Sequence, residues 1–163
     1  MIQVDSIQIR KAAAPDYPGV SLLMDELHQM HAQARPDVYR ALQTRMVKQE
    51  FVTLLETDKR YLYVAESVST GDILGYGSAQ LSLIQGVELL LDRKMLYINE
   101  LVVGSDGRGQ GTGKKLMHAL IELGRELQAD SVELTVSTFN TGAQAFYEQM
   151  GLSVRSSRME YIL

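Results

Sequence analysis

The sequence predicts a single α/β domain over residues 1–163, with helices on both faces of a mixed central sheet. Three observations support this fold class. At 163 residues and 45% hydrophobic content, the chain is long enough for one compact core. Helix-like and strand-like patterns follow one another in the order β-α-α-β-β-β-α-β-α-β. The run 95–103 is apolar with hardly any alternation, as expected of a central strand covered on both faces.

The first third of the chain predicts one strand and two helices. Alternating apolar residues indicate a strand over 2–10. Asp16 is expected to cap a helix whose apolar residues recur at helical spacing from Val20 to Met30, and this helix should end before Pro36. A second helix is expected over 42–55.

The rest of the chain predicts a hairpin and then alternating strands and helices. Strands over 61–65 and 73–84 flank a turn at 70–72, which favours an antiparallel pair. The later elements are the strand 95–103, a helix through 116–127, a strand over 132–136, a helix over 141–150 ended by Gly151, and a strand-like tail over 152–163.

Composition excludes several classes of protein. The formal net charge of -4 argues against a general nucleic-acid binder, and no apolar run is long enough to span a membrane. The chain has no cysteine, so disulfides and thiolate catalysis are absent, as suits a reducing compartment. The start of the chain does not resemble a signal peptide. These observations predict a cytoplasmic protein.

A glycine-rich run between a strand and a helix predicts an anion site. Glycine occupies positions 107, 109, 111 and 113, and Arg108, Lys114 and Lys115 add positive charge. Glycines let backbone N–H groups approach a phosphate closely, and the start of a helix adds partial positive charge.

Two common phosphate motifs are contradicted at named positions. A nucleotide P-loop ending at Gly113-Lys114 would need glycine at 108, which is Arg, and Ser or Thr at 115, which is Lys. The dinucleotide fingerprint fails at Thr112 if it starts at 107, and at Lys114 if it starts at 109.

The pattern that fits is Arg-x-x-Gly-x-Gly, at Arg108, Gly111 and Gly113. With it, the chain resembles the GNAT family of N-acetyltransferases, whose pyrophosphate loop has this form. Residues 98–103 resemble the family's splayed fourth strand, the segment from Asn140 to Leu152 resembles its second cofactor motif, and residues 7–12 resemble its usual opening. The resemblance implies a GNAT-like fold, acetyl-CoA as co-substrate and no metal.

The resemblance also implies which residues hold the cofactor. The strand backbone near 101–103 should pair with the pantetheine arm, and a backbone N–H of Val102 or Val103 should polarise the thioester carbonyl. Asn140 is expected to contact the arm, to cap the helix that follows, or both. The implied cofactor-binding set is Leu101, Val102, Val103, Arg108, Gly109, Gln110, Gly111, Thr112, Gly113, Lys114, Asn140, Ala143 and Tyr147.

Acetyl transfer to an amine needs a base and an acid. Glu100 is the best candidate for the base that collects the ammonium proton; its alternative is a structural salt bridge. Strand alternation predicts that its side chain shares a face with Ile98 and Val102. Asn99 is an alternative that would order a water. Tyr147 is the candidate acid for the leaving thiolate; its alternative is a core aromatic.

The acceptor is not readable from the sequence, and small-molecule amines and peptide or protein amines stay open. By resemblance, the corner after the first helix contributes to the acceptor site, through His31, Arg35, Pro36, Asp37 and Tyr39. Asp25, His28 and His31 share a helix face, but a solvated or acceptor-facing surface is favoured over a metal site there.

The run 88–94 is expected to be either a mobile flap or an apolar patch used in a homodimer.

The leading function is an N-acetyltransferase that uses direct attack of a primary amine in a ternary complex. Its alternatives are a non-catalytic CoA-binding sensor or partner module, and a nucleotide hydrolase.

Overall fold

The computed structural model describes residues 6–163 and contains one five-stranded sheet in the order β1-β2-β3-β4-β5. Neighbouring strands are antiparallel except β4 and β5, which are parallel. The sheet is therefore mixed, as expected. Its strands are β1 (Ile7–Lys11), β2 (Arg60–Ser67), β3 (Ile73–Ile84), β4 (Arg93–Val103) and β5 (Ser131–Glu133).

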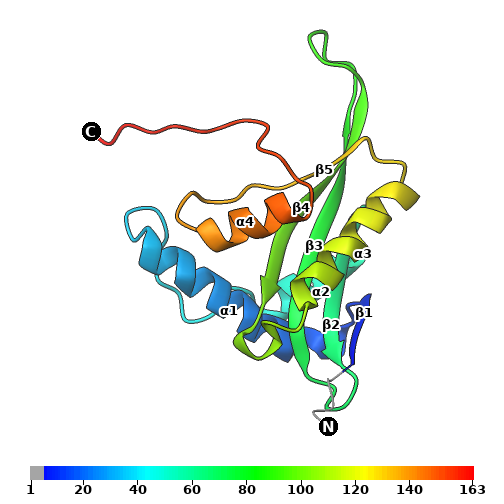
Figure 1. Ribbon diagram of the computed structural model, residues 1–163, viewed down its shortest axis with the longest axis vertical. Helices are drawn as coiled ribbons and strands as arrows, with labels where there is room; N and C mark the ends of the chain where they lie inside the picture. Colours follow the sequence, from blue (N-terminus) through cyan, green and yellow to red (C-terminus); the bar gives the residue numbers. More distant parts are fainter. Residues whose placement is uncertain (1–5) are drawn as a thin grey trace.

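Helices cover both faces of this sheet (Figure 1). On one face, α1 and α2 bury Met24 and Phe51 against Tyr76 of β3 and Val102 of β4. On the other face, α3 packs its apolar side on β3 and β4, and α4 joins the same core. The helices are α1 (Tyr17–Ala34), α2 (Lys48–Glu56), α3 (Thr112–Glu126) and α4 (Thr141–Gln149), with short 3-10 turns η1 (Ala14–Asp16) and η2 (Ser105–Gly107).

A β-bulge at Asn99 divides β4 into two halves. Ile98 is opposite Ala79 of β3, but Glu100 is opposite Ser78, so Asn99 is an extra residue. Ser78 and Ala79 are adjacent and lie on opposite faces, and so therefore do Glu100 and Ile98. The prediction that Glu100 shares a face with Val102 is confirmed, and the prediction that it shares one with Ile98 is wrong.

Strands β4 and β5 separate just before this bulge. They pair only between 95–97 and 131–133. Beyond Tyr97, the edge of β4 that faces β5 has no strand partner within residues 6–163. The backbone groups of this edge are therefore free to pair with an extended ligand.

Three predicted elements differ from the structure, and part of a fourth is not described. The second helix begins at Lys48 rather than 42, because Leu42 is exposed and only Met46 of that stretch enters the core. The strand over 132–136 is reduced to β5, because β4 turns away. The tail over 152–163 forms no strand, and the part of the first predicted strand at 2–5 lies outside the described residues.

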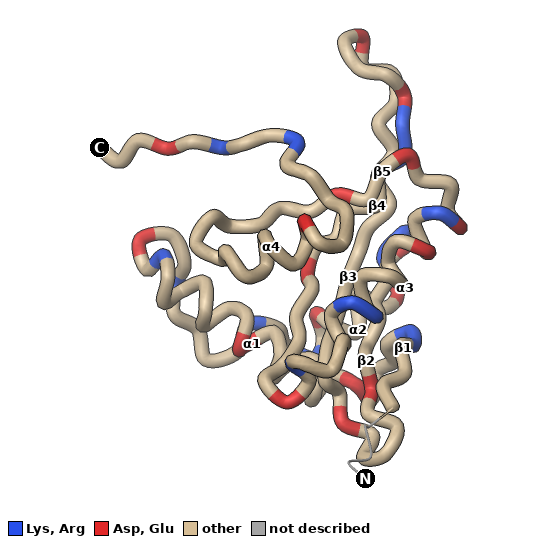
Figure 2. Tube along the Cα trace, in the orientation of Figure 1, with Lys and Arg blue, Asp and Glu red and all other residues tan. Residues whose placement is uncertain are grey.

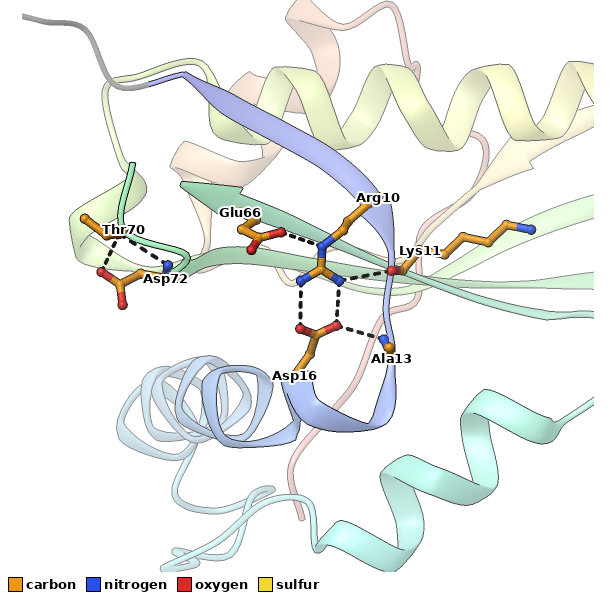
Figure 3. Close-up of polar contacts among 7 residues, drawn as sticks. All are labelled: Arg10, Lys11, Ala13, Asp16, Glu66, Thr70 and Asp72. Carbon is orange, nitrogen blue, oxygen red and sulfur yellow. Dashed lines mark hydrogen bonds and ion pairs between the residues drawn. The ribbon is translucent and has the colours of Figure 1, made fainter. Parts of the chain in front are cut away.

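A charged cluster fastens β1 to the start of α1 (Figure 3). The guanidinium of Arg10 donates two hydrogen bonds to the carboxylate of Asp16, at 2.8 and 2.9 Å, and one to Glu66. Asp16 stands at the N-cap position of α1, as predicted, but its carboxylate accepts from the N–H of Ala13 instead of from the helix. The prediction of a side-chain cap is therefore wrong, because Arg10 and the preceding turn use both carboxylate oxygens.

The hairpin between β3 and β4 projects well beyond the rest of the sheet (Figure 1). Its tip contains the run 88–94, in which Leu89, Leu90 and Leu91 are exposed. Its use as a flap or a dimer patch stays a prediction. Within the described part of the chain, no helix combines the length and apolar character that crossing a membrane requires.

Candidate functional site

The glycine-rich run forms the loop between β4 and α3, and its glycines serve different purposes. Gly109 and Gly111 have φ of +74° and +77° and face open space. Gly107 is buried, and a Cβ there would lie 2.8 Å from the carbonyl oxygen of Leu74. The loop therefore needs glycine at 109 and 111 for backbone conformation and at 107 for close packing.

The loop presents a series of unpaired backbone donors. The N–H groups of Gly109, Gln110 and Gly111 have no acceptor anywhere in residues 6–163. The first-turn N–H groups of α3, which begins at Thr112, lack intrahelical acceptors by geometry. A buried side chain stabilises the loop conformation, since Thr112 Oγ1 donates a hydrogen bond to the carbonyl of Gly107 at 2.7 Å. Such an arrangement suits a phosphate or pyrophosphate group.

The cations near this loop are not equivalent. Arg108 is exposed and donates to Glu26 of α1 at 2.8 Å and to the carbonyl of Val103 at 3.3 Å. The ammonium group of Lys115 instead donates a hydrogen bond to the carbonyl of Ile7 in β1 at 3.2 Å. The expectation that Lys115 adds its charge at the glycine loop is therefore wrong. Lys114 is exposed at the start of α3, which Figure 2 shows as a basic segment. Lys114 therefore has no ion-pair partner within residues 6–163, whereas Arg108 lies beside the loop in an ion pair with Glu26.

Substitution of Gly107 tests this division of roles. Gly107→Ala is expected to lower the free energy of unfolding by about 1–3 kcal/mol, because the added methyl group meets Leu74 in a packed environment. Gly142→Ala in the first turn of α4 is the control, since a methyl there meets nothing within 4 Å and should leave stability equal or slightly higher. Urea unfolding measures both, and equal midpoints would contradict the packing role of Gly107.

The end of β4 and α4 lie beside this loop. A Cβ on Gly113 would be 3.5 Å from both the ring of Phe146 in α4 and a methyl of Val103. Val102 points into the core under α1, so only its backbone is available to a ligand. The splayed edge at 101–103, the glycine loop and α4 are thus brought together.

Two predicted residues of α4 have defined environments. The side-chain carbonyl of Asn140 accepts the N–H of Ala143 at 3.2 Å, so Asn140 caps α4. Tyr147 is half-buried against Phe146, at 5.4 Å between ring centroids, and its hydroxyl has no hydrogen-bond partner in the described chain. Burial raises the pKa of Tyr147 above its ordinary value. The phenol therefore stays protonated at neutral pH and has a proton to give.

Glu100 lies in a polar cluster on the α1/α2 face of the sheet. Its carboxylate accepts a short hydrogen bond from the hydroxyl of Ser78 and lies 3.4 Å from the guanidinium of Arg60. The side chains of Glu100 and Arg60 are 17% and 11% exposed. The predicted salt-bridge alternative is therefore realised; both contacts are made by Oε2, and Oε1 accepts no hydrogen bond within residues 6–163.

Sequence reasoning missed the other members of this cluster. The hydroxyl of Tyr76 and the Nε of Arg60 are buried without a hydrogen-bond partner in the part of the chain that the structure describes. Burial, and next the charge of Glu100, raise the pKa of Tyr76 well above its usual range, so its phenol stays neutral at neutral pH. The sequence does contain a signal for this cluster: Tyr76 and Ser78 are polar residues two positions apart in an apolar strand, and such residues lie on the same face of the sheet.

The corner after α1 gathers aromatic side chains. The ring of His31 lies 5.3 Å from those of Tyr39 and Phe139, the latter from the β5–α4 connection. An open pocket of about 200 Å³ lies next to it, lined by residues of α1 and the segment after it, among them His28, whose ring is 6.4 Å from that of Tyr39. Asn99 is exposed at the bulge, and nothing places it with this corner.

The three candidate metal ligands are engaged elsewhere. His28 and His31 hydrogen-bond to the backbone carbonyls of Arg40 and Leu27, and Asp25 accepts the N–H of Arg45. Across residues 6–163 no three His, Asp or Glu side chains gather in a metal-binding group.

Comparison with known proteins identifies the family. The sequence profile of the Acetyltransferase (GNAT) family matches residues 24–152, which is most of the chain. The chain belongs to the GNAT family. The matched range includes the glycine loop, the splayed strand and the Asn140–Tyr147 segment.

Curated GNAT relatives agree with this assignment. The chain is 29% identical over 115 residues to an uncharacterised N-acetyltransferase of Methanocaldococcus jannaschii, which covers 71% of this chain and 49% of the relative. It is 33% identical over 121 residues to N-acetyltransferase 8B of Mus musculus, covering 70% and 46%. It is 32% identical over 114 residues to an uncharacterised N-acetyltransferase of Archaeoglobus fulgidus, covering 70% and 74%. The chain spans about half the length of the first two relatives.

Solved structures share the GNAT fold. A mutant of the BH1408 protein from Bacillus halodurans aligns with a TM-score of 0.92 at 29% identity, over 96% of this chain and 99% of that one. Glucosamine-6-phosphate N-acetyltransferase from Arabidopsis thaliana aligns with a TM-score of 0.70 at 23% identity, over 97% and 99%. The latter likeness concerns the fold alone.

Proposed function

We propose that this GNAT protein transfers the acetyl group of acetyl-CoA to a primary amine by direct attack within a ternary complex. The observation that carries the proposal is the series of unpaired N–H groups from Gly109 to Gly111, beside a strand edge that β5 leaves open. The loop suits the pyrophosphate of CoA, and the edge at 101–103 suits its amide-rich arm.

The remaining groups supply the chemistry. The amine attacks the thioester carbonyl, a backbone N–H of Val102 or Val103 stabilises the developing oxyanion, and Glu100 receives the ammonium proton directly or through water. Tyr147 gives its proton to the departing CoA thiolate. The absence of cysteine excludes a Cys-linked acetyl-enzyme. The His31–Tyr39 corner and the open pocket next to it support an acceptor site on the α1 side.

The test is a panel of amines assayed for free thiol released from acetyl-CoA. Aminoglycosides, polyamines, amino acids and lysine peptides represent the acceptor classes. Release of free thiol with one class of amine would support acetyl transfer and identify the class of acceptor. Tight CoA binding without release would favour a sensor module. Thermal stabilisation by ATP-Mg and not by CoA would favour a nucleotide site.

The role of Glu100 gives a prediction with a pH signature. Glu100→Gln is expected to lower kcat/KM about 10²-fold at pH 7, because an alkyl ammonium with a pKa near ~10.4 then keeps its proton. The loss should shrink as pH rises, since the amine then deprotonates unaided. Glu88→Gln on the exposed hairpin tip is the matched control. Parallel pH profiles for Glu100→Gln and the wild type would contradict the assignment.

A further inference from the structure

Arg60 and Glu100 share one face of the sheet because the strand register places them in neighbouring rows. One row across β2, β3 and β4 is Leu62, Ser78 and Glu100, and the next row on the same face is Arg60, Gln80 and Tyr97. Leu62 is buried in the core that α1 and α2 form, whereas Gln80 is exposed and Tyr97 is half-buried. The Arg60–Glu100 pair therefore lies at the boundary between this core and an open polar part of the sheet.

The guanidinium group of Arg60 is held loosely. Its Nη2 lies 3.3 Å from the hydroxyl of Ser78 and 3.4 Å from the carboxylate of Glu100, and its Nη1 lies 3.4 Å from the side chain of Gln80. Hydrogen bonds from arginine to a carboxylate are usually about 2.7–2.9 Å long, and Arg93 of this chain makes one at 2.8 Å. The Nε of Arg60 is buried and has no partner within residues 6–163. Arg60 therefore has donor capacity for a further anion.

Glu100 likewise has acceptor capacity left. Ser78 and Arg60 both contact its Oε2, and no hydrogen bond within residues 6–163 reaches its Oε1. Glu133, the neighbouring carboxylate on this face, differs because its two oxygens accept from Arg93 at 2.8 Å and from Arg155 at 2.9 Å. The open face thus presents one positive and one negative group that are adjacent and incompletely paired.

We propose that the acceptor is a free α-amino acid, whose carboxylate binds Arg60 while its ammonium group binds Glu100. This inference rests on the acetyl transfer proposed above and names the class of its acceptor. An α-amino acid carries both charges on one carbon, which matches a guanidinium and a carboxylate that are 3.4 Å apart. A carboxylate takes two N–H groups of a guanidinium together, and this would give the unpaired Nε a partner.

The same pair of charges disfavours an acceptor that is only cationic. An ammonium group beside Glu100 also lies beside Arg60, so attraction by the carboxylate is opposed by repulsion from the guanidinium at a similar distance. A polyamine or an aminoglycoside has no negative group to offset this repulsion. An α-amino acid gains from both side chains.

The reaction then forms an N-acetyl amino acid and CoA. The ammonium group gives a proton to Glu100, the amine lone pair forms a bond to the thioester carbon, and the C–S bond breaks with its electron pair on sulfur. The thiolate takes a proton from Tyr147. Nitrogen loses a second proton as the amide forms, and this proton replaces the one from Tyr147 through solvent, so that one proton is released per turnover. The product keeps the carboxylate contact with Arg60 and loses the ammonium contact with Glu100.

The first test uses the unaltered protein and matched pairs of acceptors. The common L-amino acids and their carboxamides are compared in the assay for free thiol released from acetyl-CoA. The amide keeps the amine and the side chain but has no negative charge. We expect kcat/KM for the preferred amino acid to exceed that of its amide about 10–100-fold, mainly through KM, as is typical of hydrogen bonds to charged groups. Release that is equal or faster with the amides, or that occurs only with spermidine or lysine peptides, would overturn the acceptor class and leave acetyl transfer standing.

The second test assigns the carboxylate contact to Arg60. Arg60→Met should abolish the preference for the amino acid over its amide, and Arg60→Lys should restore part of it. Any effect of these substitutions on Glu100 changes the rates of both acceptors, so the ratio isolates the contact with the carboxylate. Arg93→Met, on the same face and paired with Glu133, is the control that should keep the ratio of the wild type. A preference that persists in Arg60→Met would contradict the proposal.

A binding measurement separates this proposal from the proposed function. The amino acids are titrated by calorimetry into the protein saturated with CoA. Binding that is lost in Arg60→Met, without release of thiol from acetyl-CoA by the wild type, would support the amino-acid site and overturn acetyl transfer. Absence of both binding and release would overturn both proposals.

Discussion

Tyr147→Phe is expected to lower kcat about 10²-fold while leaving the affinity for CoA nearly unchanged. The substitution removes one oxygen from a ring that already packs against Phe146, so the fold and the cofactor loop stay intact. What is lost is the proton for the departing thiolate, and general acid catalysis contributes about 10²–10⁴-fold. Burial raises the pKa of Tyr147, so the phenol keeps its proton at any pH below the ordinary phenol pKa of ~10. Over that pH range, the wild-type kcat should show no decrease caused by ionisation of Tyr147.

The measurement is kcat with a saturating acceptor, together with the Kd of CoA by calorimetry. Tyr17→Phe is the matched control, since its hydroxyl donates to the carbonyl of Met46 at 3.1 Å and lies outside the proposed site. That control should lose some stability and keep its turnover. Equal kcat for Tyr147→Phe and wild type would remove Tyr147 from the mechanism and return it to the role of a core aromatic.

Asp16→Asn is expected to lower the free energy of unfolding by about 2–3 kcal/mol at pH 7. Asp16 is 8% exposed and accepts two hydrogen bonds from Arg10, and breaking a buried ion pair on one side costs about 3–5 kcal/mol. The expected loss is smaller than that range because Arg10 is 31% exposed and keeps Glu66 as a second partner.

The same contact gives a pH dependence with a definite sign. The hydrogen bonds from Arg10 lower the pKa of Asp16 below its ordinary value. A carboxyl with a lowered folded-state pKa contributes stability that is present above the unfolded pKa of ~3.9 and is lost as pH falls through the folded value. The difference between wild type and Asp16→Asn should therefore shrink below pH 4. Urea unfolding at pH 7 and pH 3 measures it, with the exposed Asp72→Asn as control. A difference that stays constant between these pH values would contradict the ion-pair account.

The loop and the order of elements were predictable because their signals are local. Gly109 and Gly111 have the positive φ that glycine favours, α4 begins at Thr141 and ends before Gly151 as predicted, and α3 covers most of the predicted range 116–127 but begins four residues earlier. The cluster around Glu100 was not predictable, because it depends on which residue of β3 faces which residue of β4. Arg60 and Ser78 are 40 and 22 residues away from Glu100 in the chain. A pairing shifted by one residue places different side chains together.

The predictions of strands over 152–163 and 132–136 were wrong for a related reason. Alternation of apolar residues in 152–163 indicates that this segment is able to pair as a strand, but it does not indicate which strand it pairs with. The pairing of 132–136 depends on where β4 turns, which is set in another segment. Lys115 was misplaced because its position on the helix, rather than its distance from the glycines in sequence, aims it at β1.

The extra residue at Asn99 has a consequence for how such a sheet arises. The half of β4 before it is anchored by Leu96 and Ile98 under α3, and the half after it by Val102 under α1. Deleting Asn99 would leave Ile98 opposite Ala79 and Glu100 opposite Ser78, so both halves would keep their faces. Only the local bend of the bulge would be lost, next to the point where β4 parts from β5. A single inserted codon therefore adds this bulge, beside the point where β4 and β5 separate, without changing the face that either half of β4 presents.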